Sequence, residues 1–147
     1  MNKSDGRRII QIEEIINRLK EAGYKLTPQR IAICKLILES KNHPSADWVF
    51  KTLKPSFPSI SLATVYKTIQ LLTELRLIQE VGIDEGKIRI DPNQSLHLNL
   101  ICTKCGNIID YITESFSQQW SKIIKELKFT PSGQLINIYY VCEKCNS

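Results

Sequence analysis

Apolar residues recur at helical spacing through the first half of the chain. Residues 9–22 carry four of them three or four positions apart, namely Ile9, Ile12, Ile16 and Leu19. Thr27-Pro28 predicts the start of a second helix, running to about Glu39, because a hydroxyl can cap the helix and proline in its first turn loses no hydrogen bond. Cys34 inside this helix is expected to be a buried core residue. Ser45 is expected to cap a third helix over 46–54, and Ser59 or Ser61 to cap a fourth that runs to about Leu77.

Between Ile78 and Ile90, apolar and polar residues alternate instead of following helical spacing. Apolar residues alternate on both sides of Asp84-Glu85-Gly86, a pattern typical of a β-hairpin. Helices followed by a hairpin give the order of a winged helix-turn-helix domain, which we place at 1–91. Residues 92–96 are rich in turn formers and predict a hinge.

The remaining residues, 97–147, predict a small α/β domain, so the fold class is α+β. Strands are expected over 97–102, 107–112 and 135–141, and an amphipathic helix carries Phe116, Trp120 and Leu127.

The helix over 62–75 has one broad apolar side and one polar side. The polar side begins with a small residue, an aromatic hydroxyl, a cation and an amide, which suits a helix in the major groove of DNA. The candidate contacts on this helix are Ala63, Thr64, Tyr66, Lys67 and Gln70, and Lys25, Arg30, Lys87 and Arg89 are candidates for phosphate or minor-groove contacts. The net charge of +5 suits phosphate backbones or anionic membranes. The alternative is a core helix with an ordinary solvated face.

The N-terminal residues are polar, and no apolar stretch has the length of a signal peptide or a membrane span. We therefore expect a cytoplasmic protein without membrane association. Thiols are kept reduced in the cytosol, so the five cysteines are expected to be metal ligands or core residues rather than disulfides.

Two Cys-x-x-Cys pairs carry the strongest chemical signal. Cys102 and Cys105 form the first pair, followed by Gly106, and Cys142 and Cys145 form the second. Four thiolates match tetrahedral zinc with no open coordination position, so the predicted site is structural. The alternatives are two redox dithiols or a rubredoxin-like iron site. Both pairs are expected in strand-and-turn context, whereas a redox pair usually opens a helix after a strand.

These features together resemble the ferric uptake regulator family over about residues 8–146. The matching stretches are Leu26-Thr-Pro-Gln-Arg30, His43-Pro-Ser-Ala-Asp47, Ser61-Leu-Ala-Thr-Val-Tyr-Lys67 and the two cysteine pairs. The arrangement is most similar to the peroxide-sensing branch. The resemblance implies a homodimer formed through the second domain, whose winged helices bind palindromic double-stranded DNA operators when a regulatory metal is bound. It also implies a base contact for Tyr66, a minor-groove contact for Lys25 and a place near the backbone for Arg30.

The resemblance further implies a regulatory metal site where the two domains meet. Its ligands would be His43, Asp91, His97, Asn99 and Asp110. His97 and Asn99 are two apart on a strand, so they share a face. The family usually has histidine where this chain has Asn99, and an amide oxygen is a harder ligand than imidazole. Such a donor set suits Fe²⁺ or Mn²⁺ and discriminates less strongly for Zn²⁺. Without the resemblance, the sequence favours a loop or capping role for His43. The alternatives for the others are a strand histidine packed near the zinc end for His97, a turn for Asp91 and a solvated strand end for Asp110.

The sequence therefore predicts a metal-dependent repressor controlling metal homeostasis or peroxide-stress genes. The alternative is a zinc-stabilised DNA-binding or interaction protein without metal sensing. An enzyme is not expected, because the chain shows no nucleophile-and-base arrangement and no phosphate-binding glycine loop, and the four sulfurs would close the metal site.

Overall fold

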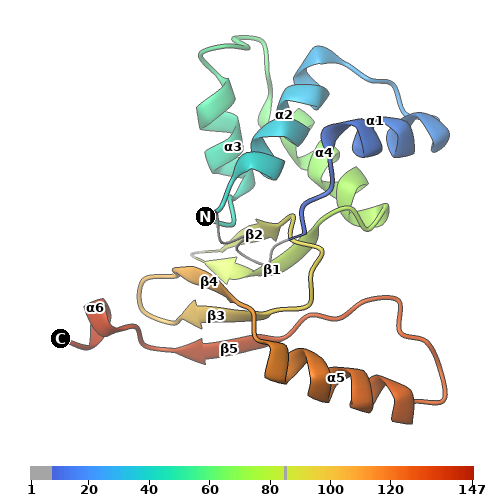
Figure 1. The fold of residues 1–147 in the computed structure, drawn as a ribbon. Coiled ribbons are helices and arrows are strands. Elements are labelled where there is room, and N and C mark those ends of the chain that lie inside the picture. Colours follow the sequence, from blue (N-terminus) through green and yellow to red (C-terminus); the bar gives the residue numbers. More distant parts are fainter. Residues whose placement is uncertain (1–7, 85) are drawn as a thin grey trace, which may run out of the picture. The chain divides into compact units, whose positions relative to one another are not determined.

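The computed structural model describes residues 8–84 and 86–147, and the chain divides into two compact units, the first ending at Gln94 and the second beginning at Ser95 (Figure 1). Four helices and a hairpin make up the first unit, and a small sheet with helices forms the second, so the α+β prediction is confirmed. The polar residues 1–7 lie outside the described part of the chain. Within that part, no helix combines the length and the apolar character that a membrane span requires.

The first unit contains four helices and a hairpin. They are α1 (Ile12–Glu21), α2 (Pro28–Glu39), α3 (Ala46–Leu53), α4 (Leu62–Glu74), β1 (Gln79–Asp84) and β2 (Lys87–Asp91). The predicted caps explain where three helices begin. The side chains of Thr27, Ser45 and Ser61 each accept a hydrogen bond from the backbone N–H three residues later.

Helix α1 is followed by a glycine whose backbone conformation terminates the helix. Gly23 has φ of +81°, and the N–H groups of Gly23 and Tyr24 bind the carbonyls of Lys20 and Leu19. This double hydrogen bond is a Schellman motif, which needs a residue in the left-handed region just past the helix. Gly23 adopts that conformation without the strain that a Cβ would bring.

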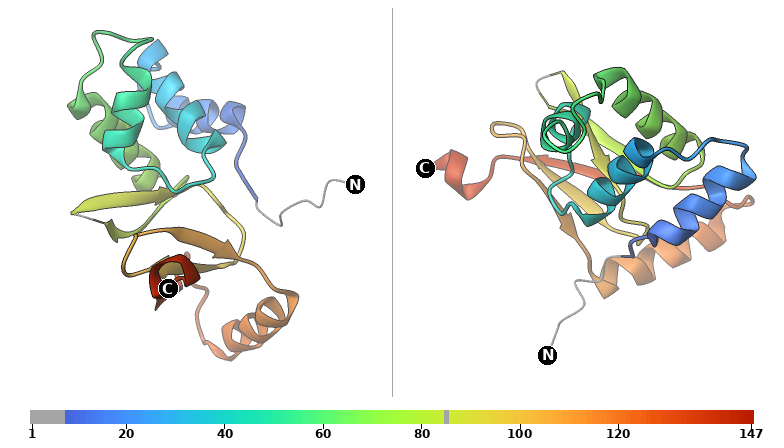
Figure 2. Two further views of the ribbon diagram at one scale, coloured as in Figure 1. Left: turned by 90° about the vertical axis from the view of Figure 1, so that its left-hand side faces the viewer. Right: turned by 90° about the horizontal axis from the view of Figure 1, so that it is seen from above.

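The core of the first unit lies among its helices. Helix α2 packs against α1, α3 and α4, and α3 also contacts β2. Figure 2 shows the four helices gathered on one side of the hairpin. The buried cluster includes Ile15, Leu19, Ile33, Cys34, Ile37, Val49, Val65 and Leu72. Cys34 is thus a core residue, as predicted, and burial raises the pKa of its thiol to about 12.

The hairpin ends in two buried residues of β2. Strands β1 and β2 are antiparallel, and a bulge between Glu80 and Gly82 shifts the register. Ile90 and Asp91, the last residues of β2, are both buried. Glu85, in the predicted turn, lies outside the described residues.

The second unit is a three-stranded sheet with two helices. Its elements are β3 (Leu98–Cys102), β4 (Ile108–Tyr111), α5 (Glu114–Glu126), β5 (Asn137–Tyr140) and α6 (Glu143–Asn146). The strand order is β4-β3-β5, with β3 antiparallel to β4 and parallel to β5. Helix α6 was not predicted, because four residues are too few to show a helical period.

Candidate metal centres and nucleic-acid interface

The sheet of the second unit brings the two cysteine pairs together. Cys102 ends β3 opposite Tyr140 at the end of β5, and the chain reaches Cys142 two residues later. The four sulfur atoms all lie within 4.8 Å of one another, and Cys105 Sγ is 3.8 Å from Cys142 Sγ. Zinc–sulfur bonds of about 2.3 Å in a tetrahedron place the sulfurs roughly 3.8 Å apart. The cluster therefore has the dimensions and the donors of a structural zinc site.

Backbone N–H groups support the first thiolate of the cluster. Hydrogen bonds from the backbone of Cys142, Cys105 and Lys104 lower the pKa of Cys102 to about 6. The tight turn after Cys105 depends on Gly106, which has φ of +71° and donates its N–H to the Cys102 carbonyl. The pKa of Cys145 is raised to about 12, first by its hydrogen bond with Cys142 and then by those with the other thiols. A divalent cation bound by the four sulfurs would replace these hydrogen bonds and favour the thiolate forms.

The structure corrects one expectation about the cysteine pairs. The first pair lies in a strand-and-turn context, as predicted, but Cys142 is the N-cap of α6 and Cys145 lies within that helix. The second pair therefore has the strand-then-helix setting that we associated with redox dithiols. What opposes the redox interpretation is the convergence of both pairs on one point, with all four sulfur atoms within 4.8 Å of one another.

The second unit also gathers three of the predicted regulatory ligands. His97 Nε2 lies 3.1 Å from Asn99 Oδ1 and 3.8 Å from Asp110 Oδ1. Asn99 pairs with Asp110 across β3 and β4, so both side chains project from one face of the sheet. His97 and Asn99 are buried. An imidazole nitrogen, an amide oxygen and a carboxylate oxygen thus meet inside this unit, a donor set that fits Fe²⁺ or Mn²⁺.

The first unit brings together the other two predicted ligands. His43 Nε2 lies 3.7 Å from Asp91 Oδ2, and both side chains are almost fully buried. Asp91 Oδ1 accepts the backbone N–H of Asn93 at 2.8 Å, which leaves the second carboxylate oxygen toward the imidazole. His43 has φ of +49°, a conformation that costs free energy and that surrounding contacts must hold.

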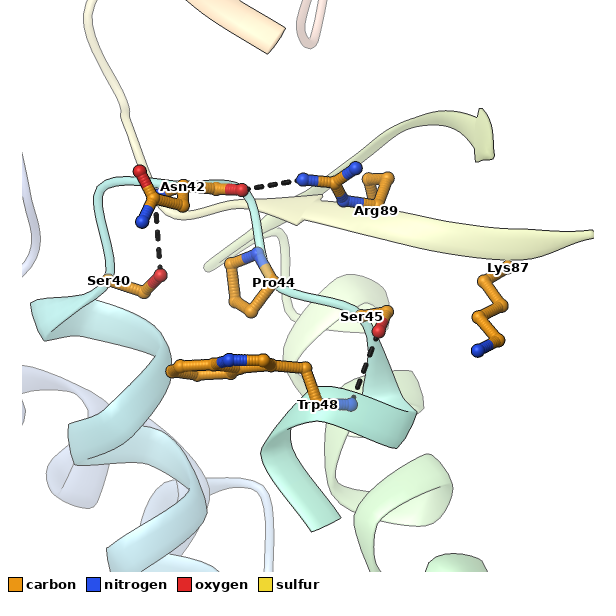
Figure 3. A pocket seen from close by; sticks show the side chains of 7 residues that line it. All are labelled: Ser40, Asn42, Pro44, Ser45, Trp48, Lys87 and Arg89. Atoms are coloured by element: carbon orange, nitrogen blue, oxygen red, sulfur yellow. Dashed lines mark hydrogen bonds between the residues drawn. The ribbon is translucent and has the colours of Figure 1, made fainter. Parts of the chain in front are cut away.

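Arg89 supplies those contacts. Its guanidinium donates from Nε to the His43 carbonyl at 2.5 Å and from Nη2 to the Asn42 carbonyl at 2.7 Å, and the Ile90 N–H binds the Pro44 carbonyl. The loop carrying His43 is thus fastened to β2, the strand that ends in Asp91. Figure 3 shows Arg89 reaching Asn42 on one side of a pocket and Trp48 on the other. The pocket has a volume of about 280 Å³.

We expect Arg89→Leu to lower the free energy of unfolding of the first unit by about 2 kcal/mol, because it removes charged hydrogen bonds to two loop carbonyls. The matched control is Lys87→Leu on the same strand, whose ion pair with Asp47 (3.0 Å) is exposed and contributes about 0–1 kcal/mol. Urea unfolding followed by Trp48 fluorescence, with Trp120→Phe in both variants, measures the difference. Equal losses in the two variants would contradict the role given to Arg89.

The predicted DNA-facing residues of α4 lie on its exposed side. Tyr66 is 48% exposed, and Ala63, Lys67 and Gln70 are exposed as well. Thr64 is half-buried, and its hydroxyl lies 2.9 Å from that of the capping Ser61. Gln70 donates to Glu74 within the helix. On the opposite side Thr68 is fully buried, which the sequence did not predict; its hydroxyl binds the Thr64 carbonyl.

The residues predicted to contact phosphates differ in their exposure and in their hydrogen-bond partners within the protein. Lys25 is exposed, and Lys87 keeps 45% of its side chain exposed despite its ion pair with Asp47. Arg30 is half-buried and donates to the Lys25 carbonyl, and Arg89 binds the carbonyls of the His43 loop. The two arginines therefore have structural partners that the sequence could not reveal.

Comparisons with known proteins agree with this architecture. The family model of the ferric uptake regulator family matches residues 21–139. The peroxide-responsive repressor PerR of Staphylococcus epidermidis is 33% identical over 135 residues, which cover 92% of this chain and 90% of that protein.

Two solved structures share the fold. The Helicobacter pylori ferric uptake regulator has a TM-score of 0.79 at 19% identity, covering 96% of this chain and 97% of its own. The Francisella tularensis ferric uptake regulator with iron has a TM-score of 0.68 at 28% identity, covering 85% and 96%. The match of the family model to most of the chain, together with the PerR likeness, shows that this chain belongs to the ferric uptake regulator family of metal-dependent DNA-binding repressors, which are regulators and not enzymes.

Proposed function

We propose that this chain is a cytoplasmic homodimer that represses metal-homeostasis or peroxide-stress genes by binding palindromic operators when its regulatory site is metal-loaded. The observation that carries the proposal is the burial of imidazole and acid groups in pairs, His43 with Asp91 in the first unit and His97 with Asp110 in the second, in a chain that also contains a four-cysteine cluster. Buried ionisable groups cost free energy unless they are paired or bind a cation. The Staphylococcus relative named a peroxide-responsive repressor favours the peroxide branch.

The metals follow from the donors of each centre. We propose Zn²⁺ at Cys102, Cys105, Cys142 and Cys145, and Fe²⁺ or Mn²⁺ at His43, Asp91, His97, Asn99 and Asp110. The iron in the related Francisella structure supports Fe²⁺. A bound divalent ion supplies positive charge that ligands from both units share. Because ligands from two units must then converge, the metal favours one arrangement of the units over others, as any metal-triggered switch requires.

We further propose a winged-helix domain over 1–91, a hinge over 92–96 and a zinc-binding dimerisation domain over 97–147. The division of the chain between Gln94 and Ser95 supports this hinge. The dimerisation role is supported by the apolar surface of the second unit, which exposes Ile109, Tyr111, Ile123, Phe129, Leu135, Ile138 and Tyr139. So many exposed large apolar side chains on a small unit are typical of an interface. In the first unit, α4 is the proposed reader of the major groove.

Operator affinity measured with and without metal tests the proposal. A duplex enriched from a random pool by the Mn²⁺-loaded protein serves as operator. We expect chelation of the regulatory metal to weaken binding by about 5- to 150-fold, while the zinc measured by elemental analysis stays at one per chain. The alternative, a zinc-stabilised DNA-binding protein without sensing, predicts no dependence on Mn²⁺ or Fe²⁺. Binding that is independent of both ions would reject the proposal.

Substitutions on two elements separate base reading from phosphate binding. We expect Tyr66→Ala to weaken the enriched duplex by about 5- to 150-fold but random DNA much less, since a direct base contact is worth about 1–3 kcal/mol. Lys87→Ala is expected to weaken both duplexes about equally and to reduce the salt dependence of binding. Fluorescence anisotropy at several salt concentrations measures all four affinities. Parallel losses for the two variants would argue against base reading by α4.

A further inference from the structure

Three polar side chains lie in a row across the sheet of the second unit. Asn99 on the central strand β3 pairs with Asp110 on β4 and with Asn137 on β5. Residues directly opposite one another on neighbouring strands project from the same face of a sheet. Asn137 was not a candidate from the sequence, because nothing in a single strand reveals which residue its neighbour will face.

The hydrogen bonds fix which atoms of this row face His97. His97 Nδ1 lies 2.7 Å from the Ser95 carbonyl oxygen, which can only accept, so Nδ1 carries the proton. In the neutral imidazole Nε2 then presents a lone pair. It faces Asn99 Oδ1 at 3.1 Å and Asp110 Oδ1 at 3.8 Å, which are also acceptors. These three groups lie close together, and one divalent cation can accept all three as ligands.

Asn137 decides which end of the Asn99 amide faces that point. Asn99 Nδ2 donates to Asn137 Oδ1 at 3.2 Å, so the amide oxygen is turned toward His97. Asn137 is fixed in turn by donating from Nδ2 to the Tyr139 hydroxyl at 3.5 Å. Without the Asn137 acceptor, the amide gains by turning over, because Asn99 Nδ2 would then donate to His97 Nε2. That bond would occupy both groups and remove two metal ligands at once.

We infer that Asn137 is a positioning residue that makes the Asn99 amide oxygen a metal ligand and so biases the regulatory site toward hard divalent ions such as Mn²⁺. The inference rests on the proposed regulatory site. An amide oxygen suits Mn²⁺ better than Zn²⁺, which prefers nitrogen and sulfur donors. Asn137 therefore acts on selectivity as well as affinity, since its loss removes the oxygen ligand and leaves a site with fewer, softer donors.

A double-mutant cycle on the full chain, with zinc retained at the cysteines, tests the inference. Mn²⁺ binding is measured from the electron paramagnetic resonance signal of free Mn²⁺, and Zn²⁺ by competition. We expect Asn137→Leu, and the milder Asn137→Ala, to weaken Mn²⁺ binding by about 10- to 100-fold and Zn²⁺ binding much less. Asn137→Asp keeps an acceptor for Asn99 Nδ2 and is expected to bind Mn²⁺ at least as tightly as the unmodified chain.

The Asn99→Asp background provides the matched control. A carboxylate offers oxygen whichever way it is turned, so adding Asn137→Leu there is expected to change Mn²⁺ affinity by less than about threefold. An equal loss from Asn137→Leu in both backgrounds would overturn the inference, because Asn137 would then act only through packing. If the unmodified chain binds zinc at its cysteines but no Mn²⁺, the proposed regulatory site fails and the inference fails with it. Normal Mn²⁺ binding with no effect of Asn137→Leu overturns the inference alone.

Discussion

Removing the metal from the four-cysteine site, or replacing Cys142 with serine, is expected to unfold the second unit while the first unit keeps its helices. The two units differ greatly in their hydrophobic cores. The first buries a large cluster that includes Ile15, Ile33 and Leu72. Among the described residues of the second unit, Cys102 and Ile108 are the only buried hydrophobic ones. The second unit therefore depends on other sources of stability.

Metal binding is the largest such source. Zinc in structural sites contributes apparent binding free energies of about 10–16 kcal/mol, which are as large as the typical stability of a whole domain of about 5–15 kcal/mol. The cysteines fasten the turn after β3 to the segment after β5, so loss of the ion releases the parallel pairing of these strands. The chain provides one tryptophan for each unit, Trp48 in the first and Trp120 in the second.

Thermal unfolding of single-tryptophan variants, made with Trp48→Phe or Trp120→Phe, measures each unit separately. Chelation should abolish the cooperative Trp120 transition and leave the Trp48 transition within a few degrees of its original midpoint. Cys34→Ala is the matched cysteine control, since Cys34 lies in the core of the first unit and should leave the zinc content unchanged. A cooperative Trp120 transition that survives complete removal of zinc would contradict the structural role of the site.

The sequence predicts most strongly where local rules decide. Thr27, Ser45 and Ser61 begin helices because each side chain satisfies a backbone N–H that the helix leaves unbound, and this rule depends on neighbours in sequence alone. The two cysteine pairs are also predictable from local sequence, because two intervening residues let both sulfurs reach one ion. Local rules do not predict very short helices such as α6. They also miss buried polar residues such as Thr68, whose hydroxyl forms its hydrogen bond within its own helix.

Residue roles that depend on strand pairing or loop packing could not be predicted from the sequence. Asn137 faces Asn99 only because β5 pairs in parallel with β3, a contact between residues 38 positions apart. Arg89 resembles a phosphate contact in sequence, whereas the fold directs its guanidinium to carbonyls of the His43 loop. Both residues act through the metal-ligand candidates beside them. Hydrogen bonds from a neighbouring residue to a metal-ligand candidate depend on tertiary structure. They can be identified only when the strands and loops are in place.

His43→Ala is expected to abolish the metal-induced gain in operator affinity. In the proposed site, His43 and Asp91 belong to the first unit, while His97, Asn99 and Asp110 belong to the second. A metal changes DNA affinity only by its differential affinity for two states of the protein, and that difference arises when ligands from both units bind one ion. Without His43, Mn²⁺ should still bind the ligands of the second unit, but it should lose most of its coupling to the DNA-reading helix.

The ratio of operator affinities at saturating Mn²⁺ and in chelator measures this coupling. We expect the ratio to fall from about 5- to 150-fold to nearly one in His43→Ala. Asn42→Ala is the matched control in the same loop, because it changes an exposed side chain but keeps the carbonyl that Arg89 binds. By thermodynamic reciprocity, operator DNA should also cease to tighten Mn²⁺ binding in His43→Ala. A ratio that His43→Ala leaves intact would mean that the metal acts through the second unit alone, and the switch would then have to lie in dimerisation rather than in the first unit.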